Sequence, residues 1–434
     1  MLPRTLAISL LVATLITFTA SAQTGGGSGR LTFFGSFQRA TFDDGSKRDF
    51  SELSASVTFR SRLAEESDGL EYAIDLRETA YPSSEGRSPR TRLYDAWGGG
   101  RTANGRLSFR AGQMWLHDFG ALGSIGGVMA EYRIRETAAG RVRLGVFGGA
   151  EPKSFDTGYA PNVKKGGAWI AFDGNRTRRH VLGYVTTRNS GLTERSVITT
   201  TNFLPVGKKF FVYQLAEYDL QGPGGAGKGG LNYFFANARY TPTRVVELLA
   251  TVHRGRSIDA RTITEDILNG RAVDQKSLDG FLFQSAGGRV TVEVLPNVRV
   301  HAGYASDRHN RDDQSFGRIS AGIWASNLAG SGFDVTLSDN RSDRPGGSYD
   351  AWYASLGRGF GSRLYLTVDY ATSLAIVRVI DNGATIEQRP QSKRYGLHGV
   401  GNLTRMFSII TTLEQLRDDS STDRRGTFGL IVRF

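Results

Sequence analysis

Apolar and polar side chains alternate with a period of two along much of this chain, and this feature constrains the fold most. In residues 70–80, Leu70, Tyr72, Ile74 and Leu76 form one face, and the other face carries the charged and hydroxyl side chains of Glu71, Asp75, Arg77 and Thr79. A period of two places the apolar residues on one face of a β-strand, whereas a helix needs a period of 3.6. The same alternation recurs in 53–62, 107–112, 142–148, 289–294, 298–304, 333–338 and 364–370.

The connections between these segments are short and long in turn. Counting from Leu31, the pattern predicts about 22 strands, with a range of roughly 18 to 22. Short turns on one rim and long loops on the other are typical of an all-β, antiparallel up-and-down transmembrane barrel. A soluble sandwich also alternates, and a propeller would repeat a blade motif that this sequence lacks. The short connections are 135–141, 173–177, 204–208, 241–244, 295–297 and 402–405, and the long ones are 81–89, 151–165, 220–228, 255–283, 307–314, 341–347 and 379–390.

The composition agrees with strands that have one apolar face. Glycine accounts for 55 of the 434 residues, aromatic residues for 11%, and proline for only 11 positions. The mean hydropathy of −0.30 resembles that of a soluble protein, because apolar and polar faces average out in a barrel. The chain contains no cysteine, so no disulfide framework supports it.

The N-terminal segment has the pattern of a secretory signal peptide. Arg4 precedes an apolar run, and Ala20-Ser21-Ala22 forms a small-x-small cleavage site, which predicts a signal peptide over residues 1–22. The apolar run is too short for a membrane span, and no other stretch is long enough. No cysteine stands at the cleavage site, so a lipid anchor is excluded. We expect residues 23–30 to be a short flexible segment and residues 31–434 to form a single barrel domain.

The last strand, 426–434, carries a specific resemblance. Phe428, Leu430, Val432 and Phe434 form its apolar face, and Ile431 interrupts the alternation. This strand resembles the C-terminal signature of Gram-negative outer-membrane β-barrels of the porin-like class. The resemblance implies location in the outer membrane, contact with its lipid and lipopolysaccharide, and recognition of Phe434 by the barrel-assembly machinery. We also expect the last strand to pair with the first, which removes the free edges of the sheet.

The polar faces of the strands predict the interior of the barrel. The pore-lining candidates are Arg77, Arg110, Arg143, Arg299, Glu71, Asp75, Asp334 and Asp369. The chain has 54 basic and 42 acidic residues, and an excess of positive charge in a confined channel favours anions. Alternatively, the arginines pair with carboxylates across the wall and mainly order the interior.

These features predict a passive channel for small hydrophilic solutes with a mild anion preference. Only eight residues, 23–30, precede the first expected strand, so no N-terminal plug or energy-coupling segment is expected. Two alternatives stay open. One is a sheath around a partner in an export or electron-conduit assembly. The other is an outer-membrane hydrolase that uses Ser124, His117 and Asp118.

Several loops and motifs carry weaker predictions. The loop 255–283 either folds inward as a constriction or lies on the surface, and "TEDILNG" within it predicts a helix with Glu265 and Asp266 in its first turn. Loops 306–313 and 338–347 are candidates for calcium or lipopolysaccharide phosphate. "GPGGAGKG" (222–229) ends in glycine where a phosphate-binding loop needs Ser or Thr. The histidines lack metal-site spacing, and the basic residues form no single patch, so no cofactor, metal or nucleic acid is expected.

Overall fold

The computed structural model describes residues 26–61, 67–83, 87–116, 119, 123–153, 157–174, 178–310, 314–344, 346–381 and 384–434. The expected signal peptide therefore lies outside the described residues. The first strand begins at Gly27, so residues 27–30, which were expected to precede the barrel, belong to its wall.

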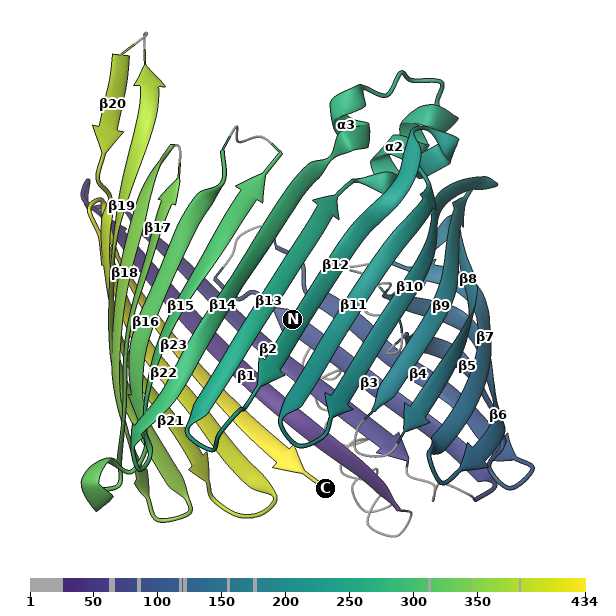
Figure 1. Cartoon of the computed structure of the whole chain (residues 1–434), viewed down its shortest axis with the longest axis horizontal. Helices are drawn as coiled ribbons and strands as arrows, with labels where there is room; N and C mark the ends of the chain where they lie inside the picture. The colour runs from purple at the N-terminus through teal and green to yellow at the C-terminus, as the bar shows by residue number, and fades with distance from the viewer. Residues whose placement is uncertain are drawn as a thin grey trace.

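All described strands belong to one antiparallel sheet that curves into a barrel (Figure 1). The strands are β1 (Gly27–Phe42), β2 (Lys47–Ser61), β3 (Gly69–Ala80), β4 (Arg90–Thr102), β5 (Leu107–Trp115), β6 (Ser124–Thr137), β7 (Gly140–Pro152), β8 (Tyr159–Gly174), β9 (Arg179–Asn189), β10 (Leu192–Val206), β11 (Phe210–Gln221), β12 (Lys228–Tyr240), β13 (Val246–Ser257), β14 (Phe281–Leu295), β15 (Val298–His309), β16 (Phe316–Ala325), β17 (Phe333–Arg344), β18 (Gly347–Phe360), β19 (Leu364–Asp381), β20 (Ala384–Gln388), β21 (Gln391–Asn402), β22 (Phe407–Asp418) and β23 (Ser421–Arg433). The helical segments are α2 (Ala260–Leu268), α3 (Gln275–Asp279), η2 (Pro223–Gly225) and η3 (Leu328–Gly330).

The closed wall has 22 strand positions, which confirms the predicted count. Strands β20 and β21 share one position because both pair with β19, one above the other. Arg389 and Pro390 separate them, and a proline nitrogen cannot donate to the strand ladder. Among the described residues, no helix is long and apolar enough to cross a membrane.

The first and last strands pair and close the barrel, as predicted. The ladder between β1 and β23 extends from Arg30 opposite Arg433 to Phe42 opposite Ser421. The Phe434 amide donates to the Gly29 carbonyl at 3.1 Å, and the Gly29 amide donates back at 2.8 Å. The Phe434 ring stacks on Phe59 of β2 at 6.3 Å between centroids. The terminal aromatic residue is therefore fixed at the seam.

The connections divide between the two rims as the sequence predicts. All six expected short connections lie at the rim that holds the seam residues Gly29 and Phe434, and the expected long ones lie at the opposite rim. Two expected loops are mostly strand, so that part of the prediction was wrong. β17 and β18 leave only 345–346 between them, and the β19–β20 hairpin projects beyond its neighbours at the top left of Figure 1. In this hairpin the cross-strand pairing of β19 continues beyond the neighbouring strands. The period-two pattern alone did not reveal this extension.

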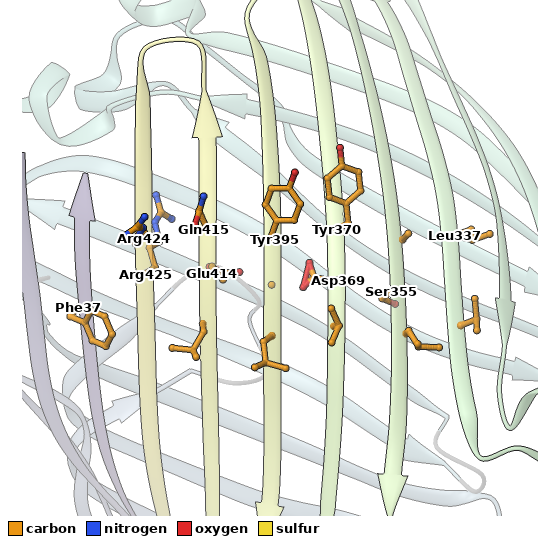
Figure 2. A pocket seen from close by; sticks show the side chains of 17 residues that line it. Phe37, Leu337, Ser355, Asp369, Tyr370, Tyr395, Glu414, Gln415, Arg424 and Arg425 are labelled. Atoms are coloured by element: carbon orange, nitrogen blue, oxygen red, sulfur yellow. The ribbon is translucent and has the colours of Figure 1, made fainter. Parts of the chain in front are cut away.

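The outer face carries the predicted apolar side chains. Leu70 is 77% exposed and Val368 is 58% exposed. Such a surface is unfavourable in water and suits the hydrocarbon region of a bilayer. Figure 2 shows part of this wall, where Phe37, Leu337, Tyr370 and other side chains line an open hollow of about 970 Å³. The architecture is that of a transmembrane β-barrel.

Candidate functional site: the inner face of the barrel

The eight pore-lining candidates share one face of the sheet, the face opposite the exposed apolar residues. Cross-strand partners set this parity, because directly opposed residues point the same way. For example, Asp369 of β19 lies opposite Gly396 of β21, while its neighbour Val368 belongs to the exposed outer set. The inner face carries Arg77, Arg110, Arg143, Arg299, Glu71, Asp75, Asp334 and Asp369.

Arg143 on β7 is held between two carboxylates. Its Nη1 donates to Glu131 Oε2 at 2.7 Å, and its Nε donates to Asp173 Oδ2 at 2.5 Å. The Arg143 side chain is only 10% exposed, and its guanidinium lies 5.0 Å from the Trp169 ring. This arginine orders β6, β7 and β8 as one unit.

The other three candidate arginines also have acidic neighbours. Arg77 Nη2 lies 2.9 Å from Glu52 Oε1. Arg110 Nη2 lies 3.9 Å from Glu71 Oε2, and Arg299 Nε lies 3.3 Å from Glu293 Oε2. Each of the four candidate arginines therefore has at least one carboxylate neighbour within the wall. Ion pairing of this kind is the alternative that the sequence left open.

The acidic candidates have different surroundings. Glu71 is buried and forms an ion pair with Arg101, whereas Asp75 lies opposite Asp95 on β4. Tyr365 Oη donates to Asp334 Oδ2 at 2.6 Å.

Asp369 is the most enclosed of these acids, with 1% of its side chain exposed. It accepts from Arg394 Nη2 at 2.8 Å and lies 2.5 Å from His398 Nε2. Glu71 and Asp369 thus hold inner basic side chains in place.

One inner cavity, of about 280 Å³, has a strong excess of positive charge. Two carboxylates, Glu131 and Asp173, face six arginines there. Only two of the six, Arg110 and Arg143, are among the candidates predicted from the sequence. The signal that could have found the others is the spacing of two, since Arg133 and Arg141 share the inner face with Glu131 and Arg143. The six arginines are Arg101, Arg110, Arg133, Arg141, Arg143 and Arg179.

Leu116 and Phe119, in the connection between β5 and β6, pack inside the barrel beside this cavity. Phe119 is 1% exposed, and its ring centroid lies 5.3 Å from Phe147 and 6.2 Å from Trp169. Together with inner side chains of β3 to β10 they form one apolar cluster. The described residues that pack inward from a connection are thus Leu116 and Phe119, between β5 and β6, whereas the sequence suggested only 255–283 for this role.

The loop 258–280 lies at the rim (Figure 1). Its helix α2 packs against η2 and β10, and Arg261 Nε donates to Glu194 Oε2 at 2.6 Å. The predicted helix exists, but its start was predicted wrongly. Asp259 caps it by accepting from the Thr262 amide at 3.0 Å, so Glu265 and Asp266 fall beyond the first turn.

The alternation in 231–240 and 406–416 does not show from sequence which face points inward, and the strand partners decide it. In 231–240, Phe235 faces inward opposite Leu215. In 406–416, Glu414 faces inward opposite Gly396.

The motifs considered for other chemistry have these positions. Ser124 begins β6 opposite Trp115, while His117 and Asp118 lie outside the described residues. Lys228 of the glycine-rich segment 222–229 begins β12, so a strand follows it. Within the described ranges, no three His, Cys, Asp or Glu side chains gather as a metal site requires.

No protein-family model matches the sequence, and no curated protein matches it. The fold is similar to several solved structures. With Pseudomonas aeruginosa OccK2 (OpdF) in complex with glucuronate it shares 11% identity at a TM-score of 0.46, over 94% of this chain and 98% of the other. With Pseudomonas aeruginosa OccK11 (OpdR) the values are 10% and 0.45, over 94% and 96%. With Acinetobacter baumannii OccAB3 they are 9% and 0.44, over 94% and 99%. These likenesses are too low to assign a solute.

Proposed function

We propose that this protein is an outer-membrane channel through which small hydrophilic solutes diffuse passively, with a mild preference for anions. A closed barrel of 22 strands is too wide for its own side chains to fill. Its outer face suits lipid, and its inner face carries charged and hydroxyl side chains. This arrangement supports a water-filled path bounded by a membrane-compatible wall.

The observation that carries the anion preference is the arginine-rich inner cavity. Six arginines and two carboxylates line it, so the formal charge of its lining is positive. Low-dielectric walls focus the potential of such an excess along a channel. Dissolved salt screens the potential over about 8–10 Å at 0.1–0.15 M, so the preference is expected to weaken as ionic strength rises.

A planar bilayer under a KCl gradient tests this proposal. The unmodified channel is expected to show a reversal potential of the anion-selective sign. Arg110→Glu and Arg299→Glu should shift it toward cations, because each adds an inner negative charge beside an existing carboxylate. Arg341→Glu is the matched control, since Arg341 on β17 faces outward opposite Ile319. A cation-selective unmodified channel contradicts the charge argument, and absence of conductance contradicts the channel itself.

We also propose that Phe434 is the residue recognised by the barrel-assembly machinery. Its backbone pairs with Gly29 and its ring stacks on Phe59, so its loss removes seam contacts as well. Deletion of Phe434 should lower the amount of heat-modifiable barrel recovered from outer membranes. Refolding in detergent separates the two effects. A deletion variant that refolds normally but is not assembled in cells indicates recognition, whereas equal loss in both settings indicates the seam alone.

A further inference from the structure

One aromatic ring from each of six consecutive strands, β11 to β16, forms a continuous row of ring contacts. We call the row Tyr213, Phe235, His253, Phe283, His309 and Phe316 the aromatic track. Successive centroids are 5.8, 6.2, 5.4, 5.1 and 5.6 Å apart. These separations lie within the range of favourable ring pairs.

The track lies on the inner face. On β11, Tyr218 is 49% exposed and faces outward, whereas Tyr213 is of opposite parity and lies opposite Phe203 of β10. Phe235 lies directly opposite His253, and Phe283 lies directly opposite His309. The two rings of each pair therefore face the same side of the sheet. Apart from buried Phe316, the rings are half-buried, so they retain surface for a solute.

The track runs obliquely from one rim toward the other. Phe316 is the first residue of β16, next to the connection 310–315. Tyr213 is near the start of β11, next to the turn 207–209 on the opposite rim. At that end Phe203 of β10 lies 4.7 Å from Tyr213 and 6.4 Å from Phe211 between ring centroids, and the Arg239 guanidinium lies 6.0 Å from the Phe211 ring. The row therefore covers much of the height of the barrel.

A row of polar side chains runs beside the track on the same face. Asn237, Thr251, Ser285 and Asp307 each lie two residues from a track ring. Asn237 Nδ2 donates to Thr251 Oγ1 at 3.1 Å, and Ser285 lies opposite Asp307. We call these four residues the polar row.

Two groups at the Phe316 end have unused hydrogen-bonding capacity. Asp307 is 3% exposed, and its Oδ1 has no hydrogen-bond partner. The Nε2 atom of His309 is likewise buried and without a partner. Buried polar atoms without partners are unfavourable, and a ligand hydroxyl can both donate to the carboxylate and bond the imidazole.

We propose that the aromatic track and the polar row bind oligosaccharides during their passage. Sugar rings present apolar C–H faces that stack on aromatic rings, and hydroxyl edges that bond to amide, hydroxyl and carboxylate groups. An aliphatic acid has no ring face, and a simple aromatic acid has few hydroxyls for the polar row. Six successive rings offer contacts to several sugar units at once. This inference rests on the proposed channel, since it names the solute class.

Sugar-dependent interruption of the KCl current in a planar bilayer tests the inference. Maltohexaose and cellohexaose are suitable because both are neutral, so the charge of the cavity does not contribute. At least one of them is expected to block the current reversibly. Tyr213→Ala should raise its dissociation constant about three- to tenfold, the effect of one lost aromatic contact. Tyr218→Ala, on the outer face of the same strand, should leave the constant unchanged.

The polar row has its own test. Asp307→Asn is expected to weaken sugar block, because a neutral amide oxygen is a weaker acceptor than a carboxylate oxygen. Only Oδ1 of Asp307 lacks a hydrogen-bond partner, since Oδ2 lies 3.7 Å from Arg318 Nε. If Tyr213→Ala yields no heat-modifiable barrel, Phe235→Leu provides the same test, since it removes the ring and keeps an apolar side chain.

Each contrary result has a distinct meaning. A conducting channel that neither sugar blocks overturns the inference and leaves the proposed channel intact. Equal block by polyethylene glycol of similar mass, or block by benzoate but not by sugars, also overturns it. Calorimetry in detergent separates the two proposals when no conductance is seen. Sugar binding that is lost in Tyr213→Ala then supports the track while contradicting an open channel, and absence of binding overturns both.

Discussion

The inner wall of β5 to β9 and the inner wall of β11 to β16 follow the same alternation but differ in packing. In the first, Phe119 fills the space beside Phe147 and Trp169 and is almost completely buried. In the second, the aromatic track is largely half-buried, and the long loop 258–280 stays at the rim. The comparison shows that loop length does not decide which connection enters the lumen.

Glycines explain why Phe119 can enter on one side. A Cβ added to Gly183 of β9 would collide with the Phe119 ring, and one added to Gly145 of β7 would collide with Trp169. On the other wall, the inner glycine Gly255 leaves ordinary space, with His253 Nε2 at 3.4 Å from a Cβ. The packed wall thus has recesses that match large apolar side chains.

The largest expected difference between the walls concerns aromatic truncation. Phe119→Ala should lower the free energy of unfolding by about 3–5 kcal/mol, because it leaves a cavity in a packed cluster. Phe235→Ala, on the open wall, should cost about 1–2 kcal/mol, because its ring is half-buried. Guanidinium titration in lipid vesicles measures both. Equal losses would show that the two walls are packed alike.

The next largest difference in the free energy of unfolding is expected when an arginine is removed from each wall. Arg143→Ala leaves Glu131 and Asp173 without their shared partner and should cost about 3 kcal/mol. Arg299 is 49% exposed, so Arg299→Ala should cost only about 0–1 kcal/mol. The same titration serves, and Arg143→Lys tests whether charge alone suffices. A cost for Arg299→Ala as large as that for Arg143→Ala would refute the distinction.

Added methyl groups provide a finer comparison. Gly183→Ala should destabilise the barrel by about 1–3 kcal/mol through overpacking against Phe119. Gly255→Ala should change stability by less than about 0.5 kcal/mol. The two positions are matched in residue type and in parity. Tolerance of alanine at 183 would mean that Phe119 moves easily, and the recess would then not explain its position.

The smallest effect concerns the loop that stays at the rim. The Thr262 backbone amide, and next its hydroxyl, donate to Asp259 and lower the pKa of that carboxyl. A lowered pKa in the folded state means that the cap stabilises α2 above the unfolded pKa, about 3.9. This contribution disappears as the pH falls through the folded pKa. Protection factors of the amides in 258–280, which correct for the intrinsic pH dependence of exchange, should therefore fall at acidic pH, and Asp259→Asn should abolish this fall. Protection factors that stay unchanged from pH 7 to 3 would contradict it.

The sequence predicted the faces of the strands well, because a period of two needs only local information. All eight candidates face inward, and the last strand has the predicted faces, with Ile431 inward beside Arg433. It could not predict the position of Phe119, which depends on Gly183 of β9, three strands beyond β6 along the wall. It also left 231–240 undecided, because Phe234 and Phe235 put an aromatic ring on each face. The register with β11 and β13 was needed to identify the track.

The seam between β1 and β23 also determines when the barrel can close during its assembly. Its contacts join residues as far apart in the chain as Gln38 and Asp423, whose side chains are hydrogen-bonded at 2.7 Å. Since β1 precedes β23 in the chain, β1 is synthesised earlier and must wait for this partner until all the strands between them have been made. Until then the sheet has two open edges, and a second copy at the same stage presents the same pair. Closure of one chain on itself therefore competes with pairing between chains. A high local concentration of newly exported chains should favour sheets shared by several chains over single barrels.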